Sequence, residues 1–128
     1  DTQAIEGVFR FAQRAARLVN EYKDAPATDA DLKVLHKMVK KVSEDIENLR
    51  FNTAISAMMI FTNEAMGWEV RPISILRTFL QLLAPFAPHL AEELWDLLHR
   101  THGVALQVQR QAEGVVGIAK RGDIAGGV

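Results

Sequence analysis

The pattern of hydrophobic and polar positions predicts five helices along this chain of 128 residues. It is clearest between residues 28 and 50, where apolar side chains recur at steps of three and four. They are Leu32, Leu35, Val39, Val42, Ile46 and Leu49. Such steps place the side chains on one face of an α-helix, in a stripe that lasts for about three heptads. This length is short for an independent coiled coil, so the stripe predicts a helix that packs inside a bundle.

Four more helices are expected at residues 4–20, 54–65, 72–84 and 88–100. Three prolines support these limits, because Pro72 and Pro88 suit the first turn of a helix and Pro85 disfavours a helical residue before it. Thr28 and Asp31 resemble a capping box at the start of the most clearly patterned helix. Helix limits can therefore be predicted from the sequence in most of the chain.

The segment Phe51-Asn52-Thr53 interrupts the helical pattern. We expect Asn52 or Thr53 to cap the helix that follows, and Gly67 to end it. That helix is apolar on most of its faces, which is typical of a helix in the middle of a domain.

The C-terminal part of the chain has a different composition. Residues 103–128 contain six glycines and no aromatic residue. Apolar and polar residues alternate between positions 104 and 109, which predicts a short strand, and from Glu113 onward we expect a mobile chain. We therefore divide the protein into a helical domain, residues 1–100, and a tail, residues 101–128, that is a short strand or disordered. The predicted fold class is all-α, a bundle of about five helices with a short Gly-rich C-terminal tail.

Composition excludes several classes of protein. There is no cysteine, which excludes disulfides, thiolate metal sites and cysteine nucleophiles. No apolar run has the length of about 18 residues that a membrane span needs, so we expect no membrane contact. The absence of cysteine is compatible with the cytoplasmic location that we expect. The net charge of −1 does not favour nucleic-acid binding, for which a strongly basic domain is typical.

No catalytic centre is predicted, and no cofactor. The chain has no glycine-rich phosphate loop before a helix and no nucleophile motif. Two histidine pairings, His89 with Glu93 and His99 with His102, have spacings that could hold a metal ion, but neither has a third ligand in view. We therefore predict no metal site.

The basic residues are the remaining candidates for function. Four lysines lie on one stretch with no acid between them, three arginines share a polar stripe near the N-terminus, and one arginine follows the lysines. They are Lys33, Lys37, Lys40 and Lys41, then Arg10, Arg14 and Arg17, and finally Arg50. Such a set could bind nucleic-acid phosphates, and it could equally be a solvated helix face. Arg50 could instead bond terminal carbonyls or a carboxylate.

Three segments, in order, carry the motifs of one family. The first has Glu6, Gly7, Arg10, Phe11, Arg14, Arg17, Leu18 and Val19. The second has His36, Lys37, Lys40, Lys41, Asp45, Ile46, Phe51, Asn52, Thr53, Ala54 and Ile55. The third has Pro85, Phe86, Pro88, His89, Glu92, Glu93, Leu94 and Trp95. Together they resemble the anticodon-binding helical domain of leucyl-tRNA synthetases, over about residues 1–98, with Ala16 in place of the family's usual tryptophan.

The resemblance implies a domain that contacts tRNA, with leucine tRNA as the expected partner, by holding its backbone rather than by reading anticodon bases. It makes the basic residues candidates for phosphate contacts. The family's ATP-binding signatures, H-I-G-H and K-M-S-K-S, are absent, so the chain alone is not expected to make leucyl-tRNA. The sequence begins with Asp1, so two alternatives remain open. The chain could be a fragment of a synthetase, whose catalytic part would then be a second partner, or it could be a truncated relative.

Two other hypotheses remain open. The fold could serve as a non-catalytic protein-interaction or oligomerisation module that has lost RNA binding, with another copy of the chain as one possible partner. The chain could also be the remnant of a degraded gene, whose tail is out of its original reading frame.

Overall fold

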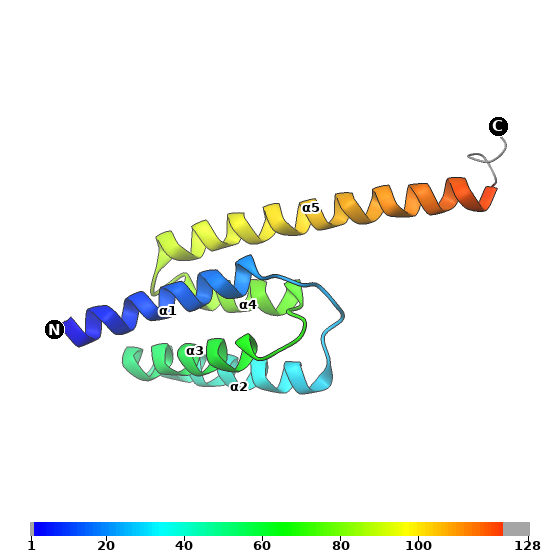
Figure 1. The fold of residues 1–128 in the computed structure, drawn as a ribbon. Helices are drawn as coiled ribbons and strands as arrows, with labels where there is room; N and C mark the ends of the chain where they lie inside the picture. The colour runs from blue at the N-terminus through cyan, green and yellow to red at the C-terminus, as the bar shows by residue number, and fades with distance from the viewer. Residues whose placement is uncertain (1, 122–128) are drawn as a thin grey trace.

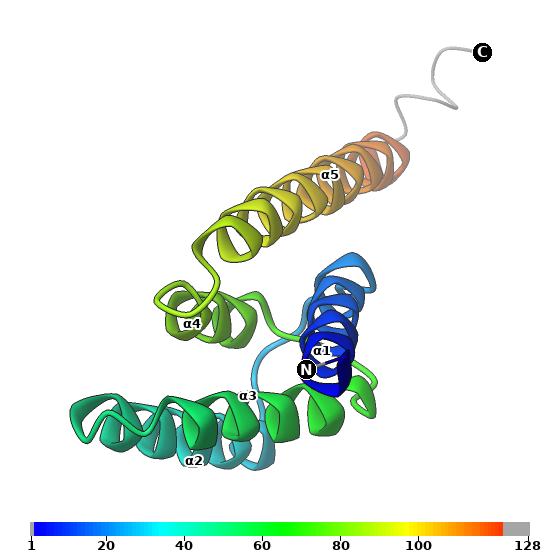
Figure 2. The same ribbon diagram turned by 90° about the vertical axis from the view of Figure 1, so that its left-hand side faces the viewer.

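Five helices make up most of the computed structural model, which describes residues 2–121. They are α1 (Thr2–Asn20), α2 (Asp29–Glu47), α3 (Phe51–Met66), α4 (Ile73–Leu83) and α5 (Pro88–Arg121). Helices α2 and α3 lie together on one side, α1 and α4 lie in the middle, and α5 covers the opposite side (Figures 1 and 2). Helix α2 contacts α3, α3 contacts α1, α1 contacts α5, α5 contacts α4, and α4 contacts α2, so the five helices form a closed ring. The all-α bundle predicted from the sequence is confirmed.

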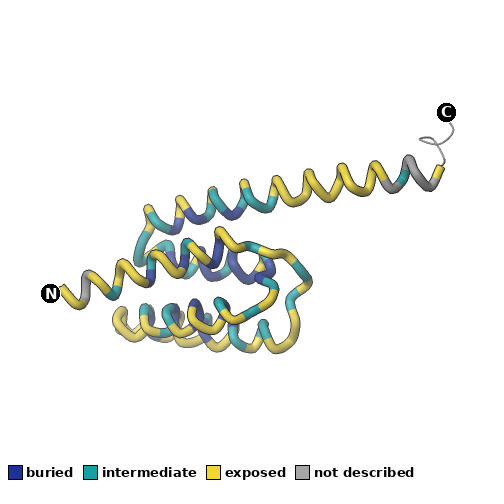
Figure 3. Tube along the Cα trace, in the orientation of Figure 1, coloured by how far each residue is buried: buried dark blue, intermediate teal, exposed yellow. Residues whose placement is uncertain are grey.

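Three aromatic rings meet in the centre of this ring of helices. The rings of Phe61 on α3 and Phe79 on α4 are stacked with their centroids 5.2 Å apart. The ring of Phe11 on α1 meets Phe79 edge-on at 6.4 Å. Leu35 and Val42 on α2 are buried as their stripe predicts, and Leu32, Val39 and Ile46 are partly buried against the core. Leu49, the last residue of the stripe, is 74% exposed, so the stripe ends before it. Buried residues occur in all five helices (Figure 3). None of the helices in the described part is long and apolar enough to cross a membrane.

The predicted helix limits agree with the structure at most ends. The hydroxyl of Thr28 accepts a hydrogen bond of 3.1 Å from the backbone N–H of Asp31, which confirms the predicted cap of α2. Helix α4 ends before Pro85 and α5 begins at Pro88. Pro72 precedes α4 by one residue instead of being its first residue.

The turn between α2 and α3 differs from the prediction. Helix α3 begins at Phe51, so Asn52 and Thr53 lie in its first turn and the predicted cap is wrong. The chain reverses through Leu49, whose φ of 57° is in the left-handed region. The N–H of Arg50 donates to the carbonyl of Asp45 at 2.7 Å, and the N–H of Leu49 donates to the carbonyl three residues back at 3.2 Å. These two bonds form a Schellman motif, which usually has glycine in the position of Leu49.

Helix α5 continues far beyond the predicted limit. It has 34 residues and includes positions 104–109, so the predicted strand is wrong. A strand must find a neighbouring strand for its backbone N–H and C=O groups, whereas a helix satisfies them within itself. Residues 103–115 are all exposed and extend past the bundle (Figures 1 and 3). The expected mobility from Glu113 onward stays a prediction; positions 113–121 are helical, and 122–128 lie outside the described residues.

The buried side chain of Arg71 joins the two loops that follow α1 and α3. Its guanidinium donates to the carbonyls of Ala65 at 3.1 Å, Met66 at 3.0 Å and Glu21 at 3.1 Å. Its backbone N–H donates to the carbonyl of Lys23 at 2.8 Å. Because carbonyls at the end of a helix carry a partial negative charge, the cation is compensated without a carboxylate. Arg71 therefore holds the ends of α1 and α3 together.

We expect Phe79→Ala to lower the free energy of unfolding by about 3–5 kcal/mol, because it removes a ring from the centre of the core. The control is Ile60→Ala, since Ile60 is 68% exposed. It should change the stability by less than about 0.5 kcal/mol. Urea unfolding followed by circular dichroism measures both. Similar small effects for the two variants would contradict the central position of Phe79.

We expect Leu49→Gly to stabilise the protein by about 1 kcal/mol, because glycine adopts a positive φ without the clash that a Cβ atom causes. The side chain of Leu49 is 74% exposed, so its removal sacrifices little buried surface. The same unfolding measurement checks this. A loss of stability would show that the leucine side chain contributes more than its backbone conformation costs.

Candidate nucleic-acid interface

The eight basic residues singled out from the sequence fall into two groups. Helix α3 contacts both α1 and α2, and the two groups lie on these two flanking helices. Arg10, Arg14 and Arg17 lie on α1, and the four lysines on α2 with Arg50 just after it. The structure therefore does not join all eight into a single patch.

Each arginine on α1 already has a partner. Arg10 lies 3.9 Å from Glu6, and the Nε atom of Arg17 lies 2.9 Å from a carboxylate oxygen of Glu21. The side chain of Arg14 donates to the amide oxygen of Asn63 on α3 at 2.8 Å. These contacts are exposed, and exposed ion pairs contribute little, so the arginines remain able to exchange partners.

Three lysines on α2 have no such partner. Lys33, Lys37 and Lys40 are exposed, and no carboxylate lies within 4.0 Å of their ammonium groups in the part of the chain that the structure describes. Helical spacing places all three on one side of α2, together with the exposed acid Glu44. We call this side of α2 the lysine face; its three ammonium groups have no acid partner among the described residues.

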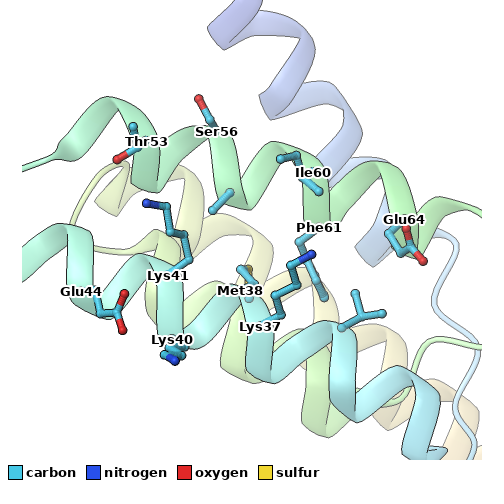
Figure 4. Close-up of a pocket in the computed structure, with 12 residues that line it drawn as sticks. Lys37, Met38, Lys40, Lys41, Glu44, Thr53, Ser56, Ile60, Phe61 and Glu64 are labelled. Carbon is cyan, nitrogen blue, oxygen red and sulfur yellow. The ribbon is translucent and has the colours of Figure 1, made fainter.

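A groove of about 690 Å³ runs between α2 and α3 beside these lysines. Lys37 and Lys41 extend from α2 toward α3 across it, whereas Lys40 points away (Figure 4). The floor and walls of the groove are mainly apolar. The lining residues are Val34, Lys37, Met38, Lys40, Lys41, Glu44, Thr53, Ser56, Ala57, Ile60, Phe61 and Glu64. The lysine face is therefore continuous with an apolar groove.

One buried carboxylate organises the end of this face. Asp45 is 0% exposed, and one of its oxygens, Oδ1, accepts from Lys41 Nζ at 3.1 Å and from Arg50 Nε at 3.0 Å. The other, Oδ2, accepts from the hydroxyl of Thr53 at 2.6 Å. The bond from Thr53 is the main cause that lowers the pKa of Asp45 from its usual 3.8 to about 2; burial opposes it, and the bonds from Arg50 and Lys41 add to it. Asp45 is thus ionised at neutral pH.

The histidines near the end of the predicted domain have structural partners. His99 Nε2 accepts from Arg77 Nε at 3.1 Å, so its Nδ1 carries the proton and donates to the carbonyl of Trp95 at 2.7 Å. His102 Nδ1 shares a hydrogen bond of 2.5 Å with the hydroxyl of Tyr22. Burial, reinforced by Asp24, raises the pKa of that hydroxyl to about 12. These bonds tie α5 to α4 and to the end of α1.

Metal-ligand clusters are absent from the described residues, where no group of three or more His, Asp or Glu side chains is placed to hold an ion. His89 is exposed in the first turn of α5.

Comparison with known proteins gives this arrangement a family. Residues 31–115 match the model of the anticodon-binding domain of tRNA ligases. The chain belongs to this family of anticodon-binding domains. The match includes α3, α4 and all of α2 except its first two residues, and therefore the lysine face, the groove and Asp45.

Individual relatives within the family are leucine–tRNA ligases. The enzyme of Bdellovibrio bacteriovorus is 50% identical over 101 residues, which are 74% of this chain and 13% of that protein. The enzyme of Borreliella afzelii is 48% identical over 103 residues, which are 79% of this chain and 12% of that protein. The resemblance to the anticodon-binding domain of leucyl-tRNA synthetases is confirmed, and the chain spans about an eighth of the length of these relatives.

The sequence of this anticodon-binding domain does not reveal the role of Asp45. Its spacing of four residues from Lys41 indicates an ordinary exposed ion pair. The bonds from Arg50 and Thr53 depend on the turn at Leu49, which brings the start of α3 back against the end of α2. A buried acid shared by two cations is thus a product of the turn.

We expect Asp45→Asn to make the free energy of unfolding less dependent on pH in the acid range. The folded-state pKa of Asp45, about 2, lies below its usual 3.8. The ionised carboxylate therefore stabilises the folded protein above about pH 4, and this contribution is lost as the pH falls toward about 2. The variant should be less stable than the wild type at pH 7 and should lose less stability between pH 4 and pH 2. Urea unfolding at several pH values tests this, and parallel profiles would contradict it.

Proposed function

We propose that this domain contacts tRNA through the phosphate backbone, with the lysine face of α2 as the contact surface. The single observation that carries the proposal is the row of Lys33, Lys37 and Lys40, exposed and without acid partners in the described structure. Unpaired ammonium groups on one face attract phosphates and release their bound counterions. Membership of the anticodon-binding domain family supports tRNA as the nucleic acid.

The wider proposal follows from the relatives. Because they are leucine–tRNA ligases, we infer that leucine tRNA is the natural partner and that the domain works beside the catalytic part of a synthetase, in translation and in the cytoplasm. Phosphate contacts carry no sequence information, so this face positions tRNA and does not select it. Selection for leucine tRNA would then come from other parts of such a synthetase.

We expect the double variant Lys37→Glu, Lys40→Glu to bind tRNA on the order of tenfold more weakly at low salt, a change of about 1.4 kcal/mol. The plot of log affinity against log salt should become shallower, with the magnitude of its negative slope smaller by about 2, because two phosphate contacts are lost. The effect should be the same for tRNAs of any sequence. Titration of labelled tRNA at two salt concentrations measures both quantities; for the wild type we expect a dissociation constant of about 10⁻⁴–10⁻⁶ M.

The matched control for this experiment is the double variant Arg100→Glu, Arg110→Glu. It changes the net charge equally, but on exposed positions of α5. Its affinity should stay much closer to that of the wild type. Equal losses in the two double variants would show that only net charge matters and would remove the lysine face from the site.

A second candidate function is self-association, which the exposed half of α5 favours. Val104, Val108 and Val115 are 62%, 59% and 58% exposed, and steps of four and seven residues place them on one face. An interaction module would use such an apolar stripe. Folded wild-type protein that does not bind tRNA at low salt, but sediments as a dimer that Val108→Asp dissociates, would favour this function over the first.

A further inference from the structure

Lys41 and Arg50 differ from the other basic residues because a single carboxylate oxygen holds both. Oδ1 of Asp45 lies 3.1 Å from Lys41 Nζ and 3.0 Å from Arg50 Nε. The side chains of the two cations are 48% and 51% exposed, whereas the carboxylate is 0% exposed. The acid thus lies beneath, and the two positive charges lie side by side at the surface.

The hydrogen bonds to Asp45 leave most donors of the two cations unused. Arg50 is bound through Nε, so the two terminal NH₂ groups of its guanidinium keep their four N–H bonds free of partners in the described structure. Lys41 uses one of its three N–H bonds. Two cations bonded to one carboxylate also retain one net positive charge. The terminal edge of a guanidinium is the part that binds a phosphate through two parallel hydrogen bonds.

Lys41 also continues the lysine face described above. Lys33, Lys37 and Lys41 are spaced by four residues, which is about 6 Å along the axis of a helix. Arg50 follows at the turn where α2 ends. The row of unpaired lysines therefore leads directly to the pair of cations held by Asp45.

We propose that Asp45 is a positioning residue, which holds Lys41 and Arg50 as a fixed phosphate-binding point for the tRNA backbone at the α2–α3 turn. This inference rests on the proposed function. Binding normally costs conformational entropy, because long basic side chains must be immobilised against the ligand. Asp45 has already immobilised these two in the folded protein, and Thr53 in turn fixes Asp45 through Oδ2.

Positioning and simple charge attraction predict opposite signs for the same substitution. Asp45→Asn removes a negative charge from the basic face, so charge attraction alone predicts tighter binding of tRNA. If Asp45 acts by positioning, the variant binds more weakly even though the protein has become more positive. The matched control is Glu44→Gln. Glu44 is the residue before Asp45; its side chain is exposed and forms no ion pair in the described structure, so the variant removes a negative charge without releasing a cation.

The experiment titrates labelled tRNA with the wild type, Asp45→Asn, Glu44→Gln and Thr53→Val at two salt concentrations. Relative to the wild type, we expect Glu44→Gln to bind tRNA equally or more tightly and Asp45→Asn to bind it at least about threefold more weakly. The magnitude of the salt slope of Asp45→Asn should be smaller by about 1. Thr53→Val changes no charge and should weaken binding in the same direction. It keeps the test valid if circular dichroism shows that Asp45→Asn does not fold.

A double-mutant cycle separates positioning from loss of structure. Arg50→Ala should weaken binding in the wild type and have little further effect once Asp45 is Asn, because Arg50 is then no longer held. Binding by folded Asp45→Asn as tight as by Glu44→Gln would overturn the inference, while the proposed function would still stand if Lys37→Glu, Lys40→Glu weakens binding. Absence of binding by the wild type would overturn both.

Discussion

The arrangement of the bundle depends on the burial of one guanidinium, that of Arg71. The last two residues of α3, Ala65 and Met66, and the residue that follows α1, Glu21, turn their carbonyls toward it and accept its hydrogen bonds. A buried cation without partners would be very unfavourable, so these three carbonyls must point toward the guanidinium. This requirement fixes the end of α3 against the end of α1. Since α2 packs along α3, the same requirement determines where the lysine face lies relative to the rest of the domain.

The domain reconciles a near-neutral charge with a basic surface by placing its acids unevenly. Glu6 and Glu21 face arginines of α1, and Asp45 lies buried beneath two cations, so these acids do not oppose the lysines of α2. Net charge is a sum over the molecule, whereas a phosphate responds to charges within about a Debye length, which is 8 Å at physiological salt. A value of −1 is therefore compatible with a local site for an anion.

The sequence predicts those parts of the fold that depend on local chemistry. The stripe containing Leu35 and Val42, the cap at Thr28 and the proline limits all act within a few residues, and the structure bears them out. The turn at Leu49 could not be predicted, because a leucine at positive φ carries no signal of its own. The strand expected at 104–109 was wrong because alternation does not show whether a neighbouring strand exists. For the candidate site, the run of lysines is visible in the sequence. A carboxylate partner for Arg50 is one of two alternatives that the sequence allows, and its identity as Asp45 depends on the turn.

Helix α5 has a consequence for the cooperativity of unfolding. Its first turns share the core through residues such as Leu98, which is 0% exposed, whereas residues 103–115 contact little besides their own helix. A free helix of this length is only marginally stable in water, and Gly103 and Gly114 each weaken it by up to about 1 kcal/mol relative to alanine. Amide protons near Leu98 should therefore exchange only when the whole domain unfolds. Amide protons a few turns further along the helix should exchange through local fraying. The boundary between two units of stability thus lies inside one unbroken helix.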